Sequence, residues 1–157
     1  MDRISTRRGL HRLIYSSTFG PKFPLAEAEQ DVEIDKIIRT AVRHNREVGL
    51  TGLLLVYRRW FIQALEGPAE AVMTTYNQIL LDSRHQGAVV LGAGPAPTRK
   101  FSKWAMCARR LSETDNDILR ALDLKSAFDP RRLTASQALH LLTVVENIQL
   151  RHTDVAE

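Results

Sequence analysis

Cysteine is almost absent from this 157-residue chain, in which Cys107 is the single example. One cysteine cannot form a disulfide within the chain or supply a cysteine-based metal cluster. The five histidines show no spacing typical of metal ligands, and no glycine-rich loop has a familiar phosphate-binding spacing. The sequence therefore predicts no metal site and no phosphate loop, and we expect Cys107 to be an inert packing residue.

Long apolar runs are also missing, since none approaches the roughly 20 residues that span a bilayer. The basic start, residues 1–8, lacks the apolar stretch and cleavage site of a secretory signal. We therefore expect a cytoplasmic protein without membrane association. The formal net charge of +4 comes from scattered Lys and Arg residues without a dense basic run, so nucleic acid is not an expected partner.

Hydrophobic periodicity predicts alternating strands and helices along most of the chain. In chain order these are a strand over 11–17, a helix that ends near His44-Asn45, strands over 51–57 and 60–65, a helix opened by Gly67-Pro68, a strand over 87–91, a loop over 92–97 and a strand over 104–111. Arg58-Arg59 should form a tight hairpin turn without the usual glycine.

The order βαββαββ favours an α+β fold of the ferredoxin-like type, with two helices on one face of an antiparallel sheet. Helices near the C-terminus can cover the other face. One is expected over 112–122, and a second follows the capping box Thr134-x-x-Gln137, with an apolar stripe along one side. We expect this pair to cover the sheet or to contact another subunit. The chain thus divides into a domain at 8–111 and a helical extension at 112–157.

Gln63 is an unusual residue for the middle of an apolar strand. Alternation places it on the same face as Phe61 and Leu65, which should point inward. A buried primary amide left without partners costs about 1–3 kcal/mol, so Gln63 needs a polar site. The alternative is an edge strand with Gln63 exposed.

Tyr15 and Asn45 are possible members of such a site. Tyr15 shares an inward face with Leu13 and Ser17, although a core tyrosine with a paired hydroxyl explains it equally well. Asn45, near a helix end, is also typical of a left-handed C-cap.

The run Asp82-Ser83-Arg84-His85 suggests acid–base or phosphate chemistry, but a polar loop after a helix commonly has this composition. An enzyme that acts on a phosphorylated substrate through Asp82, Arg84 and His85 is therefore one alternative function.

Taken together, five segments resemble the BLUF family of flavin-binding blue-light sensors. They are Leu13-Ile14-Tyr15-Ser16-Ser17, Asn45-x-x-x-Gly49-Leu50-Thr51-Gly52-Leu53-Leu54, Phe61-x-Gln63-x-Leu65-Glu66-Gly67-Pro68, Asp82-Ser83-Arg84-His85 and Phe101-x-x-Trp104-x-Met106. The segments follow the family's order over residues 10–110, and the loop after Tyr15 is longer than usual.

The resemblance implies an FAD whose ring lies between the two helices of the domain. Residues that match its binding positions are Ile37 and Ile79 on the ring faces, Asn45 and His44 at the pyrimidine edge, and Asp82, Arg84 and His85 as further contacts. Tyr15 and Gln63 match the photochemical switch. Trp104 and Met106, expected on one strand face, match a relay to the far side of the sheet.

The resemblance further implies that excited FAD exchanges an electron and a proton with Tyr15 and that the Gln63 amide then rearranges. This predicts a red-shifted absorbance without a flavin adduct. Because no enzymatic domain is expected in this chain, we expect a sensor that signals to a separate protein, and we expect a homo-oligomer. The main alternative is a flavin-free interaction domain of the same fold.

Overall fold

The computed structural model describes residues 9–112 and 128–156, with residues 149–156 described by their backbone alone. Its elements, in chain order, are β1 (Leu10–Phe19), α2 (Glu27–Val48), β2 (Thr51–Tyr57), β3 (Trp60–Pro68), α3 (Ala69–Ile79), β4 (His85–Pro95), β5 (Cys107–Leu111), the short 3-10 helix η1 (Pro130–Arg132) and α5 (Ala135–Ala156).

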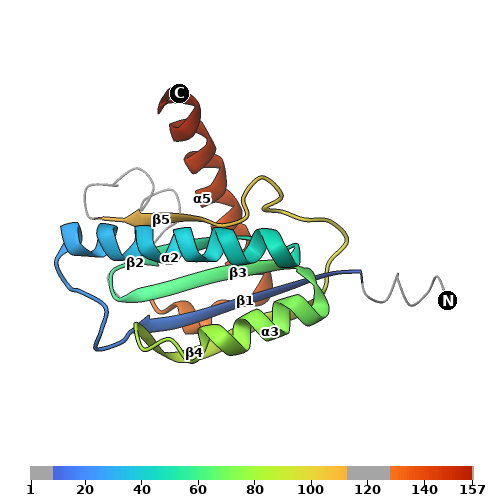
Figure 1. Cartoon of the computed structure of the whole chain (residues 1–157), viewed down its shortest axis with the longest axis horizontal. Coiled ribbons are helices and arrows are strands. Elements are labelled where there is room, and N and C mark those ends of the chain that lie inside the picture. The colour runs from blue at the N-terminus through green and yellow to red at the C-terminus, as the bar shows by residue number, and fades with distance from the viewer. Residues whose placement is uncertain (1–8, 113–127, 157) are drawn as a thin grey trace.

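In these ranges the strands form one five-stranded sheet in the order β4-β1-β3-β2-β5. Neighbouring strands are antiparallel except β2 and β5, which run parallel. Figure 1 shows α2 and α3 in front of this sheet and α5 behind it. The α+β, ferredoxin-like prediction is confirmed, and β5 makes the sheet mixed rather than purely antiparallel.

Alternating side chains of the central strands build two separate cores. Leu13 and Tyr15 of β1 and Phe61 and Leu65 of β3 pack beneath α2 and α3. The intervening residues, such as Ile62 and Ala64, pack against α5 on the other face. Gln63 lies in β3, the central strand, and only 5% of its surface is exposed. The edge-strand alternative is therefore wrong.

The C-terminal helix α5 begins as predicted. The backbone N–H of Thr134 donates to Gln137 Oε1, and that of Gln137 donates to Thr134 Oγ1, so the capping box is present. The predicted apolar stripe of α5 packs on the sheet through Ala138, Leu141, Leu142, Val145 and Ile148. Covering of the second face by α5 is thus confirmed. The helix expected over 112–122 lies almost wholly outside the described residues.

Several boundaries differ from the predictions. The first helix continues to Val48, and Gly49 takes the left-handed position with φ 78°. The C-cap alternative for Asn45 is therefore wrong, since Asn45 lies inside the last turn. Pro68 directly precedes α3 instead of opening it. The Arg58-Arg59 turn is confirmed, with Arg58 at φ 53°.

The last two strands show the largest differences. β4 extends to Pro95, through the predicted loop, because it pairs with β1 as far as His11. A glycine is required at position 92, where a Cβ would lie 2.6 Å from Ala135 Cβ of α5. β5 is shorter than predicted, because its ladder with β2 begins only where Cys107 pairs with Leu53. Trp104 therefore precedes the strand.

Candidate functional site

A pocket opens between α2 and α3 above the central strands of the sheet. Ile37, Ala41 and Asn45 of α2 line one side, and Thr75 and Ile79 of α3 line the other. Every predicted site residue except Trp104 lines this pocket: Tyr15, Ile37, His44, Asn45, Gln63, Ile79, Asp82, Arg84, His85 and Met106. Segments far apart in the sequence thus converge on one cavity.

A chain of contacts runs across the floor of the pocket. Tyr15 and Gln63 are register partners on β1 and β3, and the Tyr15 hydroxyl donates to Gln63 Oε1 at 2.5 Å. Gln63 Nε2 donates to Met106 Sδ at 3.5 Å. An amide offers two donor hydrogens and two acceptor lone pairs. One hydrogen and one lone pair of Gln63 have no partner among the described residues and are available to a ligand.

Burial decides the protonation state of Tyr15. The side chain is 3% exposed and packs against Tyr76 with ring centroids 5.3 Å apart. Desolvation, followed by the influence of Tyr76 and Asp82, raises the pKa of Tyr15 far above its ordinary value. Tyr15 is therefore a neutral phenol that donates its proton to Gln63.

Asn45 and His44 hold the edges of the pocket. Asn45 is 1% exposed, and its Nδ2 donates to the carbonyl oxygen of Ala105 at 2.7 Å. Within the described ranges Asn45 Oδ1 has no bonded partner, so it is free to accept from a ligand. His44 Nε2 lies 2.9 Å from Thr75 Oγ1 and links α2 to α3.

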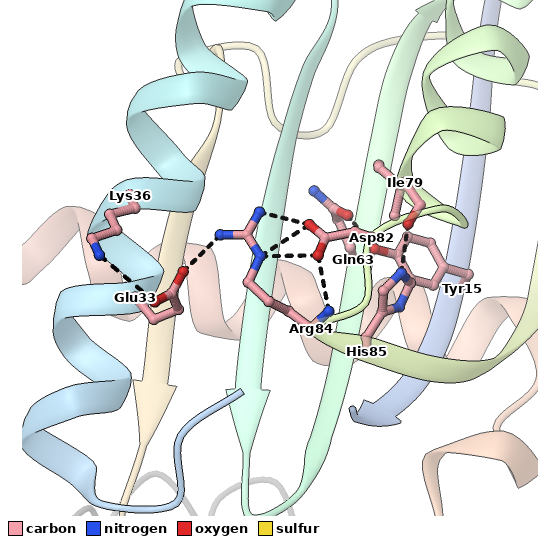
Figure 2. Close-up of polar contacts among 8 residues, drawn as sticks. All are labelled: Tyr15, Glu33, Lys36, Gln63, Ile79, Asp82, Arg84 and His85. Carbon is pink, nitrogen blue, oxygen red and sulfur yellow. Dashed lines mark hydrogen bonds and ion pairs between the residues drawn. The ribbon is translucent and has the colours of Figure 1, made fainter. Parts of the chain in front are cut away.

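An ionic cluster joins α2 to the loop between α3 and β4 at one end of the pocket, as Figure 2 shows. Arg84 donates from Nε and Nη2 to the Asp82 carboxylate and from Nη1 to Glu33 Oε2 of α2 at 2.8 Å. The hydrogen bond from the Arg84 side chain is the main cause that lowers the pKa of Asp82. Asp82 and Arg84 are therefore charged and paired with each other.

His85 forms part of the pocket wall. Its Nδ1 lies 2.8 Å from Ser17 Oγ, and its Nε2 lies 2.6 Å from the carbonyl oxygen of Ile79 (Figure 2 shows the second contact). Both ring nitrogens are engaged, and the carboxylate of Asp82 is occupied by Arg84. This arrangement gives no support to acid–base catalysis by Asp82, Arg84 and His85.

The pocket therefore presents two apolar walls and polar groups along its floor and edges. Ile37 and Ile79 lie on facing helices, while Gln63 and Asn45 offer unused amide donors and acceptors. These apolar walls and amide donors and acceptors fit a flat heteroaromatic ring that has carbonyl and N–H groups along one edge. An isoalloxazine ring has this chemistry.

A family model described as BLUF, sensors of blue-light using FAD, matches residues 10–107. The chain belongs to the BLUF family. Among curated relatives, the blue light- and temperature-regulated antirepressor BluF of Escherichia coli (strain K12) is 38% identical over 115 residues, which are 72% of this chain and 27% of that protein. The photoactivated adenylate cyclase subunit beta of Euglena longa is 34% identical over 76 residues, 48% of this chain and 9% of that protein.

Among solved structures, BlrB, a BLUF protein in its dark state, superposes with a TM-score of 0.63 at 29% identity, covering 86% of this chain and 99% of BlrB. In contrast, the chain spans about a quarter or less of the curated BLUF relatives named above. The chain thus resembles BlrB over nearly the whole of that protein but matches only a small part of the cyclase subunit.

The structure corrects the expectation that Trp104 and Met106 share one face. Met106 packs in the core beneath α2 and α3 and contacts Gln63, whereas Trp104 packs with Cys107 in the core against α5. The physical reason is that residues 101–106 are not a strand, so the rule that side chains two positions apart share one face does not apply to them. Only Met106 reaches the BLUF pocket.

Glu33 and Thr75 are site residues that the sequence reasoning missed. A glutamate on a helix is usually read as a solvated side chain, yet Glu33 lies one turn before Ile37 and so on the same face. That spacing was an available signal. No local sequence signal identifies Thr75, because its partner His44 lies on another helix.

The described residues contain no helix that is long and apolar enough to cross a membrane. In the same part of the chain, no three His, Cys, Asp or Glu residues gather in a way that could hold a metal ion. Cys107 is buried, and burial raises the pKa of its thiol to about 12, which agrees with an inert packing role.

Proposed function

We propose that this protein is a blue-light photoreceptor that binds FAD between α2 and α3 and uses Tyr15 and Gln63 as its switch. The observation that carries the proposal is the buried 2.5 Å hydrogen bond from Tyr15 to Gln63 in a pocket that leaves further capacity of the amide unused. Membership of a family whose description names blue light and FAD supports it.

The proposed binding roles follow from the lining residues. Ile37 and Ile79 hold the two ring faces, and Asn45 hydrogen-bonds the polar edge with His44 beside it. Asp82, Arg84 and His85 complete the pocket at the end of α3. When bound, FAD would supply absorption of blue light and a strongly oxidising excited state.

Tyr15 is the proposed electron and proton donor. Loss of an electron makes a phenol strongly acidic, so its proton moves along the existing hydrogen bond to Gln63 Oε1. Electron and proton then return to Tyr15, and the Gln63 amide is left rotated or tautomerised. Its changed donor pattern alters the hydrogen bonds offered to the ring edge and shifts absorbance to longer wavelength without net redox change.

We further propose that Met106 carries this change toward β5, since Gln63 Nε2 contacts Met106 Sδ. Trp104, which packs on the opposite side, is the proposed next member of the relay toward α5. Residues 8–111 would then be the sensor and 112–157 the output extension. A separate signalling protein or a change in homo-oligomer assembly would receive the signal.

The deciding experiment is a visible spectrum of the purified protein before and after blue light. We expect a yellow protein with bound FAD and an absorbance shift to longer wavelength that reverses in the dark. A colourless protein that cannot be loaded with FAD would instead support the flavin-free interaction domain. A flavin-bound protein without the shift would contradict the proposed switch.

A further inference from the structure

The chain crosses the whole sheet between its last two strands. β4 and β5 lie at opposite edges of the sheet, so residues 96–106 must pass the ends of the strands between them. This connection delivers two pocket contacts, Ala105 O to Asn45 and Met106 Sδ to Gln63. Its placement therefore determines part of the pocket.

A fully buried carboxylate holds the middle of this connection. Glu66, three residues after Gln63 on β3, is 0% exposed and has no part in the proposed photochemistry. Its Oε2 accepts from the backbone N–H of Lys100 at 2.8 Å, and its Oε1 accepts from that of Phe101 at 2.9 Å. Arg12 Nε also donates to Oε2 at 2.8 Å.

Neighbouring contacts make the same segment rigid. The Arg99 guanidinium donates to Thr51 Oγ1 and to the carbonyl oxygens of Gly49 and Glu66. Phe101 is 0% exposed and packs in the core against α5. Residues 99–101 are thus fixed by polar bonds on one side and by a buried ring on the other.

The route from Phe101 to the pocket is short and bonded. The Trp104 N–H donates to the Phe101 carbonyl at 3.2 Å, and the Gly52 N–H donates to the Trp104 carbonyl at 3.1 Å. Glycine at 52 also leaves room for Met106, whose Cε would lie 2.9 Å from a Cβ there. Phe101 is therefore connected to Met106 through Trp104 and Gly52.

We infer that Glu66 is a positioning residue of the pocket: from the opposite face of the sheet it fixes residues 100–101 and thereby sets where Ala105 O and Met106 Sδ meet Asn45 and Gln63. Its consequence for the light response rests on the proposed function, whereas its consequence for the dark structure does not.

The donor set explains why this position requires a carboxylate. Two backbone N–H groups and a guanidinium all donate to Glu66, and an ionised carboxylate only accepts. Glu66→Gln keeps the shape but replaces one acceptor oxygen by an NH₂ group that faces donors. Hydrogen bonds to the Lys100 or Phe101 amide are then lost although the side-chain volume is unchanged.

The first test is nuclear magnetic resonance of the 157-residue chain in the dark. We expect Glu66→Gln to speed hydrogen exchange by about tenfold or more at the Lys100 or the Phe101 amide, whichever faces the new NH₂ group, as loss of a charge-assisted bond implies. The cross-peak between the Met106 methyl group and the Gln63 side-chain amide should weaken or vanish.

Asp35→Asn is the control, because it removes a carboxylate from an exposed ion pair on α2 while the Lys100 and Phe101 amides stay bonded to Glu66. It should leave Phe101 exchange unchanged. An unmoved cross-peak in folded Glu66→Gln would overturn the inference. If the single variant Glu66→Gln does not fold, the double variant Arg12→Met/Glu66→Gln is measured in its place. The double variant leaves no unpaired buried charge, because both partners of the ion pair are removed.

The second test uses the dark recovery rate after blue light. If Glu66 acts through Met106, Glu66→Gln changes the recovery rate of the wild type but causes no further change in a Met106→Ala background. If the two substitutions changed the recovery rate by independent factors that multiply in the double variant, the inference would be contradicted. Failure of the proposed function has a different signature, since the wild type would then show no light response while the dark cross-peak remains.

Discussion

The two faces of the sheet use buried polar groups in opposite ways. Toward α2 and α3, Gln63 and Asn45 are buried but keep unused donors and acceptors beside a pocket. Toward α5, Glu66 is buried with its oxygens occupied by Arg12, Thr51 and two backbone amides. Gln63 and Asn45 thus keep hydrogen-bonding capacity that a ligand can use, whereas the capacity of Glu66 is taken up in holding the connection between β4 and β5.

Gln63→Leu should have the largest effect on the pocket face. Leucine keeps the bulk of the side chain but removes the amide, so we expect FAD binding with complete loss of the light-induced shift. The measurement is the light-minus-dark visible spectrum of the flavin-loaded variant. Tyr15→Phe, which removes the hydroxyl donor, is expected to give the same result. A normal shift in either variant contradicts the assignment of the switch.

Leu142→Ala should have a large effect confined to the α5 face. Leu142 is 0% exposed in the core between α5 and the sheet, so its truncation should cost about 2–5 kcal/mol of unfolding free energy. Urea denaturation measures the loss. The position of the dark flavin absorbance should stay unchanged, and a displaced dark spectrum would show that the packing of α5 affects the pocket by a route other than Glu66.

Glu33→Gln should have a smaller effect on the pocket face. The Glu33–Arg84 pair is partly exposed, with 23% and 29% of the two side chains accessible, so it contributes at most about 1 kcal/mol. We expect up to a roughly fivefold increase in the FAD dissociation constant, measured by fluorescence titration. Asp35→Asn, which affects an exposed pair that begins two residues further along α2, should leave affinity unchanged.

Glu146→Gln should have the smallest effect, and its sign depends on pH. Burial and then Glu66 raise the pKa of Glu146, so the folded protein binds this proton more tightly than the unfolded chain. Stability from Glu146 is present below its ordinary pKa of 4.5 and is lost as pH rises through the higher folded pKa. The variant should therefore be slightly more stable than the wild type at pH 7, but not at pH 4. Urea midpoints at both pH values test this.

The Tyr15 and Gln63 variants change the proposed switch itself, whereas the Leu142 and Glu146 variants change the packing of α5 on the other face of the sheet. If Leu142→Ala or Glu146→Gln abolished the light-induced shift in a folded, flavin-bound protein, the assignment of the switch to Tyr15 and Gln63 alone would fail.

Local sequence determined much of the fold and most of the candidate site. Period-2 alternation placed Tyr15 and Gln63 on an inward face, and the Thr134-x-x-Gln137 spacing identified the start of α5, because both depend on residues a few positions apart. Ten of the eleven predicted site residues line one pocket, and only Trp104 does not. Family resemblance supplied their proposed roles, which periodicity alone left open.

Only the tertiary structure decided the contacts between distant segments. Trp104 and Met106 separate because residues 101–106 cross the sheet without joining its ladder, and no local period encodes that path. Glu33 of α2 meets Arg84 of the loop that follows α3, and Glu66 binds amides 34 and 35 positions away. The sequence by itself determined that a buried amide needed partners, and the packed chain decided which groups those partners are, because hydrogen bonds require proximity in space and not in sequence.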